Sequence, residues 1–407
     1  MKEVQHSKTM LCVDRSLCFI ASDPMSLRVF LLPHLRALSP FFNLGISANT
    51  NKMELLEVIG LKLPIQYAPI QRKIKPIDDF KALWFLFRKF SLERPDAVHT
   101  LTPKAGLLGM CAAWLARVPV RVHTFTGQVW VTRQGPMRWV LKAADKCIAA
   151  FATDVLVDSP SQRSFLIQEG VVSAQGSTVL GEGSICGVDT QRFKPSPLMR
   201  QQVRAELCSA SDSLVCLYLG RLNRDKGVLD LAAAFAQVVS RHPKAELWVV
   251  GPDEDHMFAQ MQTLLSACTR QVRRVDYTNE PERFMQAADL FCLPSYREGF
   301  GSSVIEAAAC GVPALASRIY GLTDAVVEGE TGWMHEAGNV QDLTSQLDAL
   351  FKAPAELQRR GEAARATTER LFEQSLITGE MVKFYKKKYE INLTCTDLTP
   401  SNSSELN

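Results

Sequence analysis

Short apolar runs alternate with longer helix-like segments along most of this chain, and this alternation constrains the fold more than any other feature. In the first half we expect strands at 17–21, 44–47, 66–69, 96–100, 120–124 and 154–157, and helices at 25–38, 77–92, 104–116, 137–152 and 161–169. Repeated alternation of this kind predicts a parallel sheet with helices covering both of its faces.

A second series of the same type begins at Leu214. Here we expect strands at 214–219, 246–250, 290–293 and 314–317, and helices at 228–241, 303–310 and 342–351. A chain of 407 residues is too long for one core, so we predict two α/β domains with a ligand cleft between them. The expected divisions are a first domain at 1–190, an exposed connector at 193–197, a second domain at 191–369, a long amphipathic helix within 370–390 that packs back on the first domain, and a disordered tail at 391–407.

Composition excludes several classes of protein. The chain has 46 basic and 43 acidic residues, which is too balanced for a nucleic-acid-binding protein. None of its 11 cysteines forms a Cys-x-x-Cys pair, which argues against both a zinc site and a disulfide framework and favours a reducing compartment. The first 15 residues lack the apolar core of a signal peptide, and no apolar run is long enough to span a bilayer. These observations predict a cytoplasmic protein.

A strand, a glycine loop and a helix follow one another between Leu290 and Pro313. Gly299-Phe300-Gly301 gives the loop a backbone that can turn sharply and approach a ligand closely. Because unpaired amides point outward at a helix N-terminus, this arrangement predicts an anion site, flanked by Glu298 and Glu306. The alternative is purely structural: Ser303 and Glu306 fit a capping box, and Glu298 is then a solvated loop residue.

A second strand–loop–helix unit supplies the positive charge that such a site needs. The loop Gly220–Gly227 contains Arg221 and Lys226, and in a parallel sheet it opens at the same edge as the Glu298 loop. Arg221 and Lys226 suit a diphosphate, whereas isolated basic residues are more often solvated. No Gly-x-Gly-x-x-Gly or Walker motif is present, which weighs against dinucleotide oxidoreductases and phosphate-loop nucleotidases. A diphosphate beside carboxylates suggests a nucleotide sugar, with Glu306 on the ribose and Glu298 on the sugar hydroxyls.

Several motifs together resemble those of the retaining glycosyltransferases of family 4. They are Gly220–Gly227, Glu298–Glu306, Ala307–Pro313 and Gly329–Gly332 in the second half, and Pro95–Thr100, Thr102–Gly106 and Gly187–Asp189 in the first. The resemblance covers about residues 15–390 and implies the GT-B fold, in which two Rossmann-like doubly wound domains face an interdomain cleft. The run His123–Trp130 is similar to a branch that builds bacterial surface polysaccharides and lipid-linked glycans.

The resemblance also implies roles for individual residues. Arg221 and Lys226 would hold the donor diphosphate and stabilise the leaving group, and Glu306 would bind the ribose. Glu298 would position the sugar and its phosphates together with the loop residues Gly299, Phe300, Gly301 and Ser302. His123 matches the first-domain histidine near the transferred sugar, although a satisfied histidine at a strand end is the structural alternative. His99 is better explained by packing.

Two positions depart from the family pattern. Ser22–Ser26 replaces the glycine-rich loop that often follows the first strand, and Cys186 stands where asparagine often precedes Gly-Val-Asp. The first departure concerns how the first domain approaches the diphosphate or the acceptor. The second is expected to be tolerated.

The resemblance implies catalysis without a metal or other cofactor. Asp253-Glu254-Asp255 superficially matches a metal-binding Asp-x-Asp, but we interpret it as a solvated turn after a strand. The expected transition state is an oxocarbenium-like sugar leaving a diphosphate, so positioning and electrostatic stabilisation should carry most of the catalysis. Front-face attack by the acceptor hydroxyl, with a donor phosphate oxygen taking its proton, requires no covalent glycosyl-enzyme, unlike a retaining glycosidase.

Two stretches mix aromatic with basic residues, at 80–90 and 133–142, and could lie in a membrane interface. For the first, a core-facing helix with solvated charges is an equally good explanation. We therefore expect a peripheral protein on the cytoplasmic face of the inner membrane. It would transfer a sugar, an N-acetylhexosamine, from a UDP donor to a polyprenyl-diphosphate-linked acceptor in surface polysaccharide or glycan synthesis. The alternatives are a nucleotide-sugar 2-epimerase of the same architecture and a non-catalytic scaffold that binds sugar nucleotides.

Overall fold

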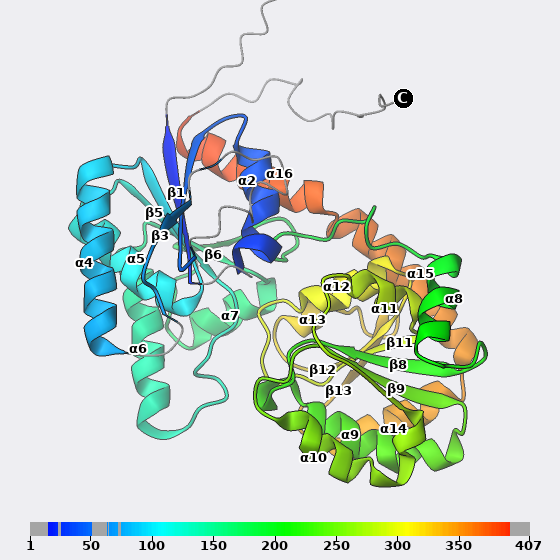
Figure 1. Cartoon of the computed structure of the whole chain (residues 1–407). Helices are drawn as coiled ribbons and strands as arrows, with labels where there is room; N and C mark the ends of the chain where they lie inside the picture. The colour runs from blue at the N-terminus through cyan, green and yellow to red at the C-terminus, as the bar shows by residue number, and fades with distance from the viewer. Residues whose placement is uncertain (1–14, 23–25, 51–62, 64, 72–74, 391–407) are drawn as a thin grey trace, which may run out of the picture.

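Each half of the chain forms a parallel sheet with helices on both of its faces (Figure 1). The computed structural model describes residues 15–22, 26–50, 63, 65–71 and 75–390. The N-terminal residues and the tail at 391–407 therefore lie outside the described residues, as does most of the loop at 22–26.

The first sheet has seven strands in the order β3-β2-β1-β4-β5-β6-β7. The strands are β1 (Ser16–Ala21), β2 (Asn43–Ala48), β3 (Ile65–Tyr67), β4 (Ala97–Leu101), β5 (Val120–Phe125), β6 (Asp154–Val157) and β7 (Ser177–Val179). The helices around it are the π-helical η1 (Leu27–Leu31), α2 (Leu32–Leu38), α4 (Pro76–Glu93), α5 (Pro103–Leu115), α6 (Gly135–Phe151) and α7 (Pro160–Gln168). The predicted elements are present, with β7 in addition.

The second sheet has six strands in the order β10-β9-β8-β11-β12-β13. They are β8 (Leu214–Leu219), β9 (Ala245–Val250), β10 (Val272–Val275), β11 (Leu290–Leu293), β12 (Ala314–Ser317) and β13 (Gly332–His335). Its helices are α8 (Pro197–Glu206), α9 (Val228–Val238), α10 (Met257–Leu264), α11 (Pro281–Ala287), α12 (Ser302–Ala309), α13 (Leu322–Ala325), α14 (Val340–Phe351) and α15 (Pro354–Leu371), with 3₁₀ turns η2 (Arg224–Lys226), η3 (Val239–Arg241) and η4 (Ser266–Gln271). The strand order reverses between β8 and β11, where ligands bind in sheets of this type.

The central strands are buried on both faces, which explains why their sequences read as nearly unbroken apolar runs. Phe19 in β1, Trp248 in β9 and Phe291 in β11 are fully buried. The described part of the chain contains no helix that is both long enough and apolar enough to cross a lipid bilayer.

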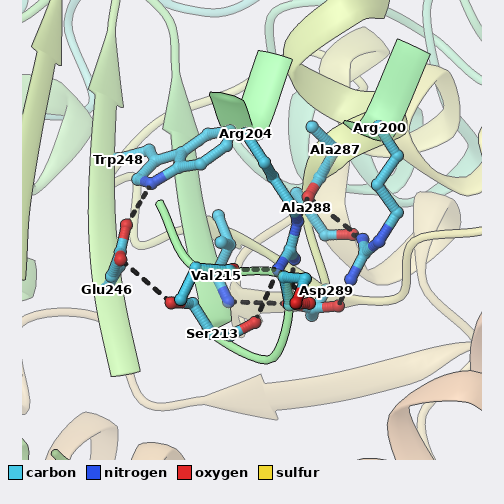
Figure 2. A network of polar contacts seen from close by, with 11 residues as sticks. Arg200, Arg204, Ser213, Val215, Glu246, Trp248, Ala287, Ala288 and Asp289 are labelled. Atoms are coloured by element: carbon cyan, nitrogen blue, oxygen red, sulfur yellow. Dashed lines mark hydrogen bonds and ion pairs between the residues drawn. The ribbon is translucent and has the colours of Figure 1, made fainter. Parts of the chain in front are cut away.

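The segment after the first domain is largely the exposed connector that the sequence predicted, since Lys194, Pro195 and Pro197 are exposed. Phe193 is buried, and helix α8 begins at Pro197. Arg200 and Arg204 on α8 donate to the carboxylate of Asp289, at 2.5 and 2.8 Å (Figure 2). The same carboxylate accepts from the backbone N–H of Val215 at 2.7 Å. This network fixes α8 to the amino-terminal edge of the sheet, opposite the predicted donor loops.

The network continues along the same edge. Arg204 also donates to the carbonyl oxygen of Ser213, and the Ser213 hydroxyl donates to Glu246 at 3.0 Å. Glu246 accepts from the indole N–H of Trp248, also at 3.0 Å (Figure 2). These buried polar groups are therefore paired with one another, as a structural network requires.

The C-terminal helix predicted over 370–389 is present and packs on the first domain, but it begins at Gln374 instead of Arg370. Helix α15 ends at Leu371, and a separate helix, α16 (Gln374–Lys388), lies beside α2 of the first domain (Figure 1). At this break the chain crosses between the domains for a second time. Val188 in the first crossing donates its N–H to Phe372 and accepts from the N–H of Gln374, at 2.8 and 2.9 Å. The two crossing segments are thus hydrogen-bonded to each other.

Candidate active site

The two loops predicted to bind the donor follow adjacent strands, β8 and β11, at the point where the strand order reverses. Gly227, at the end of the first loop, has a φ of 66°. A Cβ atom on this residue would collide with the carbonyl oxygen of Pro294 in the second loop. Glycine at this position therefore allows the two loops to touch.

Lys226 and Glu298 form an ion pair across these loops. Glu298 also accepts a hydrogen bond from the Ser295 hydroxyl at 2.8 Å. Both charged side chains are mostly buried, with 21% and 14% of their surface exposed. The cation and the carboxylate predicted to serve the donor are therefore in direct contact.

The side chain of Arg221 is more exposed to solvent than that of Lys226. Its guanidinium pairs with Glu254 at 3.1 Å, while its carbonyl oxygen accepts from the buried Tyr218 hydroxyl at 2.7 Å. The loop that carries Glu254 was interpreted as a solvated turn. Its Asp253 accepts from the backbone N–H groups of Met257 and Phe258, at 2.8 and 3.1 Å, at the start of α10. Among the described residues no cluster of His, Cys, Asp and Glu is arranged to hold a metal ion.

Helix α12 begins differently from the predicted capping box. Gly301, with a φ of 83°, is the N-cap, and no side chain caps the helix. Ser303 and Glu306 are therefore not a reciprocal cap, and that structural alternative is wrong. Ser302 is the first helical residue. The first amides of α12 stay free of side-chain caps, as an anion site requires.

Phe300 packs inside the protein and helps to hold this loop in place. It is 2% exposed, and its ring packs edge-on against Phe372 at 5.1 Å, next to the second crossing between the domains. Gly301 is equally confined, because a Cβ atom there would collide with Leu322. These contacts hold the backbone of the loop in place.

Glu306 lies one turn into α12, and its carboxylate has no hydrogen-bond partner among the described residues. Burial raises the pKa of Glu306 to about 7, although the nearby charge of Arg192 opposes this shift. Arg192 is itself paired with Glu282 at 2.7 Å. Glu306 is thus a partly protonated carboxyl group close to neutral pH, available to a ligand.

His123 lies in β5 and is 1% exposed. Its Nδ1 is 2.8 Å from the Thr100 hydroxyl on β4, and its ring packs against Phe125. A Cβ atom on Gly106 of α5 would lie 2.5 Å from the ring, so sheet and helix enclose it. Burial lowers the pKa of His123 to about 3, which keeps it neutral. The structure thus places His123 in the core, and its catalytic role stays a prediction.

Residues that the sequence did not single out form the wall facing the Glu298 loop. A Cβ atom on Gly299 would lie 2.6 Å from the carbonyl oxygen of Thr126 and 2.8 Å from a carboxyl oxygen of Asp158. Thr126 and Asp158 directly follow β5 and β6, whereas Gly299 belongs to the second domain. A polar residue after a strand is only a weak signal, because most such residues face solvent.

Two further contacts join the domains beside this wall. Asp324 of α13 accepts from both the hydroxyl and the N–H of Ser161 at the start of α7, the latter at 2.9 Å. Phe165 stacks on Tyr320 of the second domain at 4.6 Å and on Trp130 of the first at 5.4 Å. The interdomain contact thus combines hydrogen bonds with a column of three rings.

Known protein families match both domains. Residues 52–180 match the "Glycosyl transferase 4-like domain" model, and residues 199–367 match the model "Glycosyl transferases group 1". The capsular polysaccharide biosynthesis glycosyltransferase CapM of Staphylococcus aureus is 30% identical over 78% of this chain and 83% of its own length. An Escherichia coli UDP-Gal:alpha-D-GlcNAc-diphosphoundecaprenol alpha-1,3-galactosyltransferase is 28% identical over 69% of this chain and 72% of its own.

Solved structures agree on the fold. The Anabaena protein HepE, solved in complex with UDP and glucose, superposes with a TM-score of 0.78 over 92% of this chain and 100% of its own, at 18% identity. The chain has two parallel-sheet domains that face each other, and two loops of the second domain meet where its strand order reverses. This is the GT-B fold of glycosyltransferases. Together with the match to CapM, this shows that the chain belongs to glycosyltransferase family 4.

Proposed function

We propose that the protein is a retaining glycosyltransferase that moves a sugar from a UDP donor to a polyprenyl-diphosphate-linked acceptor. The observation that carries this proposal is the meeting of Lys226, Glu298 and the uncapped N-terminus of α12 at one edge of the second sheet. A cation and free amides suit a diphosphate, and a carboxylate suits sugar hydroxyls. The UDP in the HepE complex and the lipid-linked acceptor in the name of the Escherichia coli relative support the choice of substrates.

In this mechanism the donor diphosphate occupies the space between Lys226 and α12, and Glu306 accepts hydrogen bonds from the ribose. Lys226 and Arg221 stabilise the charge that develops on the leaving diphosphate, which is the main electrostatic contribution. Glu298 holds the sugar hydroxyls. The acceptor hydroxyl attacks from the side the diphosphate leaves, and a phosphate oxygen takes its proton. No metal is required, because the protein's own cations and amides face the phosphates.

We further propose that the donor sugar is an N-acetylhexosamine and that the acceptor is reached at a membrane surface. Helix α4 exposes Phe80 and Trp84, and α6 exposes Trp139 and Val140. Both helices pack on α5 in the first domain. Aromatic side chains among basic residues favour the interface of an anionic bilayer. The membrane would then bring a polyprenyl-linked acceptor close to the first domain.

A nucleotide-sugar 2-epimerase remains the second candidate, since it shares the two-domain architecture. It would alter the donor sugar without an acceptor. A non-catalytic scaffold is disfavoured by the contact between Lys226 and Glu298, which is the arrangement expected of a donor site.

The test is to incubate the protein with UDP- and GDP-sugars in the presence and absence of a polyprenyl-diphosphate-linked glycan. Transfer of sugar to the lipid, with the anomeric configuration of the donor kept in the product, supports the proposal. Release of a free altered sugar without acceptor identifies the epimerase instead. Inversion at the anomeric carbon would rule out the retaining mechanism, and unchanged activity after chelation supports the absence of a metal.

Membrane contact is tested separately by flotation with vesicles of phosphatidylglycerol and phosphatidylcholine. Phe80→Glu and Trp139→Glu should each reduce the bound fraction. Leu198→Glu is the matched control, because Leu198 is equally exposed but lies on α8 of the second domain. Equal binding by all three variants would exclude this surface as the membrane contact.

A further inference from the structure

Asp158 stands out among the buried polar groups because it touches the donor loop from the other domain. It directly follows β6 and is 5% exposed. Its backbone is tied to the first domain: the N–H donates to the Gln162 side chain at 3.2 Å, and the carbonyl oxygen accepts from Ser184 at 2.7 Å. The side chain reaches the backbone of Gly299, next to Glu298.

The carboxyl group of Asp158 is not paired with a charge. Its Oδ1 is buried without a hydrogen-bond partner among the described residues. Two cations of the donor loops are engaged elsewhere, since Lys226 pairs with Glu298 and Arg297 pairs with Asp225. A buried carboxylate in such a position is strongly disfavoured, whereas a neutral carboxylic acid is tolerated.

The other groups around Asp158 do not favour a negative charge either. Gln162 of α7 is neutral, Glu298 of the donor loop is acidic, and Cys186 of the loop before the first crossing is a buried thiol whose pKa is raised by burial, so it supplies no positive charge. Burial raises the pKa of Asp158 well above its ordinary value, and no neighbouring charge offsets this effect. Burial therefore favours the neutral carboxylic acid over the carboxylate.

We propose that Asp158 is a positioning residue for the transfer reaction: its buried side chain seats the Glu298-Gly299-Phe300 loop against the first domain and so sets where Glu298 stands relative to the acceptor. Asp158 acts through the loop, because its side chain contacts Gly299, one of the residues predicted to hold the donor, and not the donor itself. Ionisation would draw water to the carboxylate and separate the two domains at this point. This inference rests on the proposed function.

The same contact explains why two glycines face each other here. A Cβ atom on Gly127 would lie 3.2 Å from the backbone nitrogen of Gly299, and one on Gly299 would overlap Asp158 and Thr126. Since neither residue has a side chain, the first-domain wall reaches the donor loop directly. A shift at Asp158 is thus transmitted to Glu298 through one peptide unit.

The experiment compares Asp158→Asn with Asp158→Ala in the transfer assay, with UDP affinity measured in parallel by calorimetry. Asparagine has the shape of the neutral acid, so Asp158→Asn should keep kcat within about twofold at pH 7. Asp158→Ala should lower kcat by about tenfold or more, because small misplacements of reacting groups have effects of this size. The dissociation constant for UDP should stay unchanged in both. Asp145→Asn is the control, since Asp145 is a buried aspartate of the same domain that accepts from Trp130 instead.

The pH profile separates positioning from simple structural support. Between pH 6 and 9 the ratio of kcat for Asp158→Asn to that of the unmodified protein should stay constant or rise, because only the aspartate can ionise. A falling ratio, or wild-type kcat in Asp158→Ala, would overturn the inference. Failure of the unmodified protein to transfer any sugar is a failure of the proposed function, whereas transfer that Asp158→Ala leaves unaffected is a failure of this inference alone.

Discussion

Lys226 and Glu298 neutralise each other across the two loops that bind the donor in our proposal. Because Lys226 would face a diphosphate and Glu298 a sugar, donor binding must exchange this contact for two new ones. The pair therefore holds both side chains in the site before the ligand arrives, which reduces the cost of ordering them.

Lys226→Ala should lower kcat by about a hundredfold, since it removes a cation aimed at the charge that develops on the leaving group. The fold should persist because Glu298 keeps its hydrogen bond from Ser295. Steady-state transfer kinetics give the answer, and Lys244→Ala is the control: Lys244 pairs with Asp212 on an exposed surface. Near-normal turnover in Lys226→Ala would remove this residue from the catalytic site.

Binding of UDP-N-acetylglucosamine should weaken as the pH falls from 8 to 6. Since burial raises the pKa of Glu306 to about 7, the ribose-binding carboxylate is ionised above that pH and protonated below it. A group with this pKa predicts a roughly tenfold rise in the dissociation constant over the interval. Calorimetry at constant ionic strength measures it, and this donor itself does not titrate there. Glu306→Gln should bind more weakly at every pH and show no such dependence; a parallel pH dependence in that variant would exclude Glu306 as its source.

Gly299→Ala should lower kcat by up to about a hundredfold, because the new Cβ must push apart the donor loop and the backbone of Thr126. The stability of each domain should change little. Gly45→Ala is the matched control, since no atom lies within 4 Å of a Cβ built on Gly45. Wild-type activity in Gly299→Ala would mean that the close approach of the domains at this point is dispensable.

His123→Ala tests whether this histidine is structural or catalytic. Loss of the buried ring and of the hydrogen bond with Thr100 should reduce the free energy of unfolding by about 2–4 kcal/mol. Because its pKa is lowered to about 3, His123 should contribute no titration to activity between pH 5 and 8. Denaturant unfolding and a pH–rate profile check both points. Intact stability together with a large loss of kcat would instead assign the histidine to catalysis.

The sequence predicted the central strands, whose residues are mostly buried, and it missed three edge strands, β7, β10 and β13. Leu214–Leu219 was found with its observed bounds because all six residues are apolar. Strand β10 was missed because Arg273 and Arg274 make up half of it; their guanidinium groups donate to backbone carbonyls of Leu207 and Val249. Charged side chains in a strand give no periodic signal.

The break between α15 and α16 was missed for a related reason. Phe372-Glu373 contains neither glycine nor proline, so nothing local ends the helix. The break is imposed by Val188, which takes up the backbone hydrogen bonds there from a position far away in sequence.

The candidate site was predictable only in its second-domain half. Glycines next to charged residues marked the loops at 220–227 and 298–301. Thr126 and Asp158 carry no comparable signal, because their importance arises from contact with Gly299 in the other domain. Which strand-end residue faces the opposite domain depends on how the two domains are placed, and a one-dimensional pattern does not contain that information.

Helix α16 has a consequence for the order in which the protein is made. Tyr385 on this last helix is fully buried in the first domain, where its hydroxyl lies 2.9 Å from Nδ1 of His99. The domain that leaves the ribosome first therefore lacks part of its core until translation of the second domain is complete. Its nascent form should expose apolar surface around Phe19 and Phe42, which pack on Tyr385 in the finished molecule. Such surface is what chaperones recognise during synthesis of a two-domain chain.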